Sequence, residues 1–207
     1  SQWIPGPEAR ADGHHWRARS CVVLTGMGTV LKDDPQLNVR GGETPRQPRK
    51  AVVDGRFEIP EGARLFDGAE VIVFTAREDA AKAARLADKN ARVGVLPGQA
   101  PDRVDLPAVM RWFAQEQFNE VHVEAGAGLS GALVAAGCVD ELLLYLAPVL
   151  LGDAAGMVRL PMLEHLDAAQ RYEFIDAARL GADMRVRARV PDTWRQLVQR
   201  VALPALA

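Results

Sequence analysis

The sequence predicts an α/β fold in which a mostly parallel central sheet is flanked by helices and ends in an antiparallel hairpin. Short strand-like runs alternate with helical segments, which is typical of a parallel sheet because each parallel strand needs a crossover connection. Near the end of the chain, two strand-like runs are separated only by Gly181 and Ala182, the pattern of a hairpin.

The predicted strands are short apolar runs rich in valine, as expected of strands buried on both faces. The first five, assigned to the parallel sheet, are residues 21–25, 49–54, 70–75, 91–96 and 120–124. A longer apolar run, 141–152, predicts a sixth strand, and residues 172–180 and 183–190 form the hairpin.

The predicted helices lie between these strands. Pro7 and Glu8 favour a helix start, and Gly137 favours a helix end. Helices are expected over residues 7–18, 78–90, 106–117 and 130–137, with a short helical turn over 29–35 and a loop over 41–50. Residues 1–190 are expected to form one domain, and the tail 191–207 is expected to be a packing helix.

Composition limits the possible functions. The chain has 207 residues, a net charge of −2 and a pI near 6.1, so neither a nucleic-acid footprint nor a basic membrane patch is expected. No apolar run approaches the roughly 18 residues of a membrane span, and the first residues do not resemble a signal peptide. Cys21 and Cys138 lie in apolar runs and are expected to be reduced core thiols of a cytoplasmic protein.

The stretch "GAGLSG" follows a predicted strand and opens a helix. Its Gly126, Gly128 and Gly131 fit G-x-G-x-x-G, and glycine lets a backbone approach a diphosphate closely. Exposed N–H groups at the helix start would then face the anion. A tight turn with close packing is the structural alternative.

This glycine motif is not a Rossmann fingerprint, because it lies past the middle of the chain and the next acids open a strand. If the ligand is NADP, an arginine should meet its 2′-phosphate. Arg77 and Arg56 both follow predicted strands, and either could serve.

Several stretches together resemble a known family. "VVLTGMGTVLKDDPQLNVR", "RQPRKAVVD" and "VHVEAGAGLSGALVAAGCVDELLLYLAPVLLG" are similar to the reductase domain of the bifunctional riboflavin-biosynthesis deaminase–reductase, from Ser1 to about Val190. The resemblance implies a dihydrofolate-reductase-like fold. It also implies NADPH-dependent reduction of 5-amino-6-(5-phosphoribosylamino)uracil, with hydride passing to C1′ of the opened ribose.

The resemblance also implies roles for individual residues. Ser1, Arg17, Leu37, Arg40 and Glu124 are expected to contact the substrate, Arg17 and Arg40 through its phosphate and Glu124 through its pyrimidine. Residues expected to contact NADPH are Trp3, Thr29, Asp33, Gly55, Arg77 and the cradle Gly126, Ala127, Gly128, Leu129, Ser130, Gly131 and Ala132.

The proton donor stays open, with Glu124, Asp33, a water and the substrate's own groups as candidates. Asp34 is assigned to turn chemistry before Pro35. His14, His15 and His165 are expected on the surface, and His122 is expected to pack on its strand.

The chain departs from the family pattern in three places. The family's first strand and its Lys-x-Ala-x-Ser-x-Asp-Gly stretch precede "SQWI", so an interior strand is expected to be missing from the residues given. No zinc-deaminase signature is present, so no metal site is expected, and a deaminase domain would lie upstream in a longer protein. Gly55 stands where some relatives have serine, so it offers only backbone.

Two alternatives to the pyrimidine reductase stay open. One is another reductase of the same fold, such as a dihydrofolate reductase, which would not need a substrate phosphate. The other is an NADPH-binding fragment without turnover. The apolar run 141–152 could also support a subunit interface, and a homodimer is expected.

Overall fold

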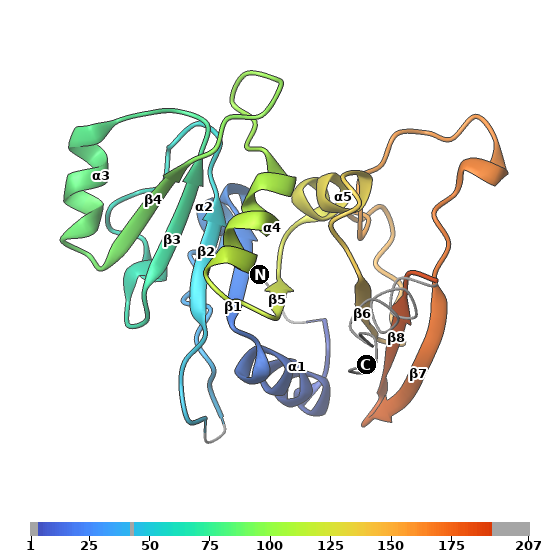
Figure 1. Cartoon of the computed structure of the whole chain (residues 1–207). Helices are drawn as coiled ribbons and strands as arrows, with labels where there is room; N and C mark the ends of the chain where they lie inside the picture. The colour runs from blue at the N-terminus through green and yellow to red at the C-terminus, as the bar shows by residue number, and fades with distance from the viewer. Residues whose placement is uncertain (1–3, 42–43, 192–207) are drawn as a thin grey trace, which may run out of the picture. The chain divides into compact units, whose positions relative to one another are not determined.

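The computed structural model describes residues 4–41 and 44–191, and the chain packs as two compact units (Figure 1). The first unit contains Ala11–Cys138 and Asp153–Leu160. The second contains residues 4–10, Val139–Gly152 and residues 161–191. The expected single domain over residues 1–190 stays a prediction, and most of the tail 191–207 lies outside the described residues. No helix in the described ranges is long and apolar enough to cross a membrane.

The first unit is built on a five-stranded parallel sheet, as predicted. The strand order is β4-β3-β2-β1-β5, and every pairing is parallel. Each strand starts and ends within one residue of its predicted range. The strands are β1 (Val22–Gly26), β2 (Arg49–Val53), β3 (Val71–Thr75), β4 (Ala91–Val95) and β5 (Val121–Val123).

Helices connect these strands, as parallel pairing requires. The first helix begins at Pro7 with Glu8 in its first turn, as predicted, and Asp79 and Asp105 cap two later helices through their side chains. The helical segments are α1 (Pro7–Arg19), α2 (Met27–Asp33), η1 (Arg64–Phe66), α3 (Ala80–Ala87), α4 (Leu106–Gln115) and α5 (Ala127–Ala135).

The helices cover both faces of the parallel sheet. On one face, Val30 of α2 and Leu86 of α3 join a buried cluster with Val52 of β2. On the other face, Phe74 of β3 packs edge-on against Phe113 of α4, with ring centroids 5.3 Å apart. Figure 1 shows α2 and α4 on opposite sides of the strands. The apolar character of the predicted strands therefore reflects burial on both faces.

The second unit contains a separate three-stranded antiparallel sheet of order β6-β8-β7. Its strands are β6 (Glu141–Leu146), β7 (Glu173–Leu180) and β8 (Asp183–Arg189), and η2 (Leu166–Ala168) precedes β7. The predicted hairpin is confirmed, with Gly181 at a φ of 62° in its turn. Within the described residues β5 pairs only with β1, and β6 pairs only with β8. The α/β class is thus confirmed, with the antiparallel strands in their own sheet.

Three details of the prediction were wrong. The strand predicted over 141–152 stops at Leu146, because Pro148 cannot donate to a strand ladder, and Leu150 is 99% exposed. The last helix of the first unit begins at Ala127 rather than at Ser130. Cys21 and Cys138 form no disulfide in the described part of the chain, but both are half-buried rather than in the core.

Candidate functional site

Glu124 directly follows β5 at the carboxyl edge of the parallel sheet. Its backbone N–H donates to the Leu24 carbonyl at 2.9 Å, and the buried Thr25 hydroxyl donates to the Glu124 carbonyl at 2.7 Å. These bonds fix the backbone of Glu124 against the end of β1. Its side chain is on the same side as that of His122, whose Nε2 lies 3.4 Å from Glu124 Oε1.

Arg17 of α1 forms a bidentate pair with Glu124. Arg17 Nε donates to Oε1 at 2.8 Å and Nη2 donates to Oε2 at 2.6 Å. Arg17 Nη1 also donates to the Asn38 carbonyl at 2.6 Å. The guanidinium is buried and each of its nitrogens has a protein acceptor. This pairing does not favour a contact of Arg17 with a substrate phosphate, and the predicted contact with that phosphate stays a prediction.

The same contacts determine the charge of Glu124. Burial alone would raise its pKa, but hydrogen bonds from His122 and Arg17 outweigh burial and lower the pKa to about 2. The Arg17 contacts are the shorter of the two sets. At neutral pH Glu124 is therefore an anion that accepts hydrogen bonds and has no proton to give. Its predicted contact with the pyrimidine is compatible with this state, whereas a role as proton donor is not.

The glycine motif forms the start of α5. Gly126 is the N-cap residue, in an extended conformation and with no side chain to cap the helix. A Cβ on Gly126 or Gly128 would meet nothing within 4 Å. The N–H groups of residues 127–129 have no acceptor in the described parts of the chain, as expected for the first turn of a helix. Open space and unpaired donors together fit a bound anion such as a diphosphate.

Gly131 differs from the other two glycines. A Cβ there would lie 2.0 Å from the Arg159 carbonyl oxygen, and Arg159 N–H donates to the Ala127 carbonyl at 2.8 Å. The segment Asp153–Leu160 therefore packs directly on α5, and Gly131 is needed for that contact. The structural alternative for the motif applies to Gly131, while Gly126 and Gly128 leave room for a ligand. Of the remaining cradle residues, Ala132 is exposed, and Leu129 and Ser130 are half-buried.

The α2 helix carries two residues predicted to contact the cofactor. Thr29 and Asp33 are one helical turn apart, so both lie on one face of α2, and Asp33 is exposed. Asp34 ends the helix in the left-handed region and accepts a hydrogen bond from Arg64 N–H at 2.9 Å, which fits its assignment to turn chemistry.

Leu37 follows this turn with a φ of 52°, although leucine has a Cβ. It is also buried. Such a conformation costs about 1 kcal/mol or more and persists only where packing holds it. Leu37 belongs to the buried core cluster of the first unit, which holds this conformation, and its predicted contact with the substrate stays a prediction.

The two arginines considered for a 2′-phosphate both have acidic partners. Arg77 Nε donates to Asp102 at 2.7 Å, and Arg56 lies 3.0 Å from Glu58. Both side chains are more than half exposed, so either pair could open at little cost. Gly55 is packed tightly, because a Cβ there would lie 1.9 Å from the Asp102 carbonyl oxygen. Its predicted backbone contact with the cofactor stays a prediction.

Arg40 and His14 lie next to each other. Arg40 N–H donates to His14 Nδ1 at 3.3 Å, while the exposed Arg40 guanidinium has no partner in the described ranges. His14 is half-buried, so its predicted surface position was wrong, whereas His15 and His165 are exposed as predicted. Its spacing of three residues from Arg17 on α1 was the sequence signal that could have placed it here.

The remaining predicted residues, Ser1 and Trp3, lie outside the described residues. A separate cavity of about 760 Å³ is lined by residues that include Pro97, Arg103 and Arg111, and it contains none of the predicted site residues. The structure thus joins Arg17 to Glu124, and places Gly126 two residues along the chain from that pair.

Comparison with known proteins supports one family. Residues 1–186 match the family described as "RibD C-terminal domain". Among curated proteins, the riboflavin biosynthesis protein RibD of Escherichia coli is 36% identical over 198 aligned positions, and the match covers 89% of this chain and 53% of the relative. The RibD of Haemophilus influenzae is 34% identical over 90% of this chain and 52% of its own length. The chain therefore spans about half the length of the curated relatives it matches.

Solved structures agree with this result. The RibD of Acinetobacter baumannii superposes with a TM-score of 0.78 at 33% identity, over 91% of this chain and 52% of that one. The riboflavin biosynthesis reductase Rib7 of Saccharomyces cerevisiae gives a TM-score of 0.70 at 22% identity, over 89% of this chain and 81% of that one, which supports the fold alone.

Proposed function

The chain belongs to the RibD C-terminal domain family, and on this premise we propose that it reduces 5-amino-6-(5-phosphoribosylamino)uracil to 5-amino-6-(5-phosphoribitylamino)uracil, with NADPH as reductant, in riboflavin biosynthesis. One observation supports a particular site for this reaction. Gly126, the N-cap of the open first turn of α5, follows an anionic Glu124 by two residues, at the carboxyl edge of a parallel sheet. Ligands of open α/β sheets bind at that edge.

The residues present fit NADPH. The N–H groups at the start of α5, which have no acceptor among the described residues, suit the diphosphate, and so does the lack of a Cβ at Gly126 and Gly128. Thr29 and Asp33 would hold the nicotinamide half, and Arg77 or Arg56 the 2′-phosphate. NADPH supplies the hydride, and the protein's part is to orient C1′ of the substrate and exclude water.

The choice between the two arginines can be tested by substitution. Arg77→Ala should narrow the preference for NADPH over NADH by about tenfold, the value of one charge-assisted hydrogen bond. Dissociation constants for both cofactors would measure it. Arg56→Ala is the matched control, since its exposed pair with Glu58 resembles that of Arg77 with Asp102. If only Arg56→Ala changes the preference, the role belongs to Arg56.

The substrate would use the polar groups beside β5. Glu124 would accept N–H bonds from the pyrimidine, because an anion held by Arg17 can only accept. Arg40 would bind the ribose phosphate through its guanidinium, which has no partner in the described part of the chain, and Leu37 would contact the ribose or ring. With Glu124 ionised, Asp33, a water or the substrate itself is left as the proton donor.

Turnover tests the proposal directly. The loss of NADPH absorbance is followed with the phosphorylated substrate and with its dephosphorylated form, and the product is identified by its gain of two hydrogen atoms. Reduction that requires the phosphate supports the proposal and speaks against a dihydrofolate reductase. Saturable NADPH binding without reduction would contradict the proposal and favour a non-catalytic cofactor-binding fragment.

We also propose that the protein is a cytoplasmic homodimer. Apolar side chains of the second unit are strongly exposed, including Phe174 at 80% and Leu150 at 99%, and such surface is typical of a subunit interface. Light scattering would measure the mass. In a longer protein, a zinc deaminase domain upstream would supply the preceding deamination.

A further inference from the structure

His14 of α1 has a defined tautomer. Its Nδ1 accepts the Arg40 N–H at 3.3 Å, so Nδ1 carries no proton. A neutral imidazole with an accepting Nδ1 carries its proton on Nε2 and donates from there. His14 is half-buried, and Nε2 has no acceptor within residues 4–41 and 44–191. The ring is thus oriented by one nitrogen while the other keeps a donor available.

The charges around His14 favour the neutral ring. Burial lowers the pKa of His14, and the nearby Arg17 and Arg40 guanidinium groups lower it further, against an opposing effect of Glu124. Arg17 and Glu124 neutralise each other as a bidentate pair. The Arg40 guanidinium has no acidic partner within the described residues, so a net positive charge is left near His14.

The two residues joined by the bond from Arg40 N–H to His14 Nδ1 each keep a side-chain donor without an acceptor in the described chain, His14 Nε2–H and the Arg40 guanidinium. All three nitrogens of Arg17, by contrast, already have acceptors. A phosphate monoester offers only acceptor oxygens and carries negative charge, so it matches an arginine beside a neutral imidazole donor.

We propose that His14 is the second ligand of a phosphate-monoester site begun by Arg40, with Nε2–H donating to a phosphate oxygen and Nδ1 fixing the Arg40 backbone. The proposal rests on the proposed function, because it assigns the substrate's ribose phosphate to this site. It also gives Arg17 a different part, which is to hold Glu124 as an anion.

Asparagine separates the two functions of His14. In His14→Asn the side-chain oxygen can still accept the Arg40 N–H, as Nδ1 does, but the donor at the position of Nε2 is lost. His15→Asn is the matched control, because His15 is the exposed neighbour on the same helix. Circular dichroism would verify that both variants fold.

Isothermal titration with ribose 5-phosphate, and with ribose as the phosphate-free probe, measures the effect. His14→Asn should weaken ribose 5-phosphate binding about tenfold, the loss of one charge-assisted hydrogen bond, and His15→Asn should leave it unchanged. Binding of ribose should not differ among the three proteins.

The inference is overturned if His14→Asn binds ribose 5-phosphate as tightly as the wild type, or if the wild type does not bind it. Either result leaves the reductase proposal to the turnover assay. Weakened phosphate binding in His14→Asn, together with a wild type that shows no turnover, would instead support the site and reject the reductase function.

Discussion

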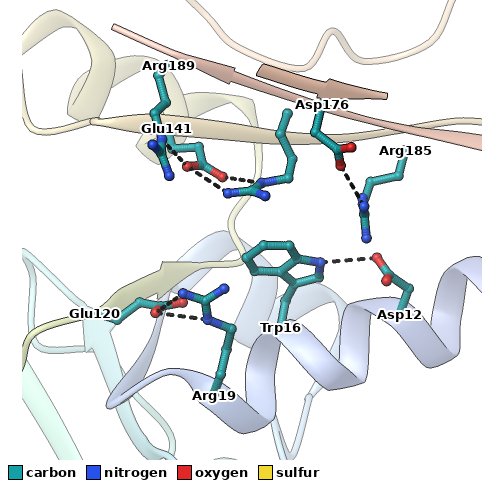
Figure 2. A network of polar contacts seen from close by, with 9 residues as sticks. Asp12, Trp16, Arg19, Glu120, Glu141, Asp176, Arg185 and Arg189 are labelled. Atoms are coloured by element: carbon teal, nitrogen blue, oxygen red, sulfur yellow. Dashed lines mark hydrogen bonds and ion pairs between the residues drawn. The ribbon is translucent and has the colours of Figure 1, made fainter. Parts of the chain in front are cut away.

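The two edges of the parallel sheet differ in how their polar groups are paired. At the amino edge, where the strands begin, acids and arginines form a chain of ion pairs. Glu70 lies 2.7 Å from Arg49 and 2.8 Å from Arg92, and Arg92 also lies 2.9 Å from Glu116. Arg19 pairs with Glu120 at the same edge (Figure 2). Arginines there also lie over aromatic rings, Arg49 over Phe118 among them.

At the carboxyl edge, polar groups are left available. The first turn of α5 exposes backbone donors beside Gly126 and Gly128 that have no acceptor within the described residues. The ion pair between Arg17 and Glu124 lies beside them and keeps Glu124 charged. We infer that unpaired donors, rather than the number of charges, are what would make the carboxyl edge a binding edge.

The largest effect is expected from a side chain placed in the open space at the carboxyl edge. Gly128→Val should weaken NADPH binding by roughly a hundredfold or more, because a branched side chain would keep a diphosphate from about two backbone donors. Fluorescence titration of NADPH measures it. Gly62→Val is the matched control, since a Cβ at Gly62 also meets nothing within 4 Å but lies in an exposed turn. Equal NADPH affinity of both variants would contradict a diphosphate site at Gly126 and Gly128.

Breaking the pair at the carboxyl edge should reduce stability. Arg17→Met leaves the Glu124 carboxylate without its bidentate partner and should lower the free energy of unfolding by about 2–3 kcal/mol, somewhat less than for a fully buried pair. Urea unfolding measures the change, and Arg19→Met is the exposed counterpart on the same helix. A loss no larger than that of Arg19→Met would contradict a structural role for the pair.

The pH dependence of stability tests whether Glu124 is ionised in the folded protein. The pKa of Glu124 in the fold, about 2, is below its ordinary value of 4.5, so its ionised form stabilises the fold. That contribution is complete above about pH 4.5 and is lost as the pH falls toward 2. Glu124→Gln cannot titrate, so its stability deficit relative to the wild type should shrink over this window. A stability deficit of Glu124→Gln that does not change with pH would contradict the lowered pKa of Glu124.

The smallest effect is expected at the amino edge. Glu70→Gln weakens two partly exposed ion pairs and should cost about 0.5–1 kcal/mol of stability, with kcat and KM unchanged. Thermal unfolding and steady-state kinetics measure the two effects. A change in KM without a loss of stability would mean that the amino edge takes part in binding.

Local sequence patterns predicted most of the fold. Valine-rich runs and helix starts such as Pro7 act within a few residues, so strand positions, the first helix and the hairpin at Gly181 could be predicted. The end of β6 was missed because apolar character outweighed Pro148 in the prediction.

The site was harder to predict because its contacts join distant residues. The family resemblance singled out Arg17 and Glu124, but not that they bind each other across 107 positions. Likewise, nothing near Gly131 in the sequence indicates that the Arg159 carbonyl excludes a side chain there. Such contacts depend on tertiary packing, which local patterns do not encode.

Hydrogen–deuterium exchange with and without NADPH tests the difference between the two edges most directly. Saturating NADPH should protect peptides that cover residues 124–131, which include the first N–H groups of α5, and should leave peptides covering residues 112–120 at the amino edge unchanged. Saturable binding with no protection at residues 124–131 would contradict the account.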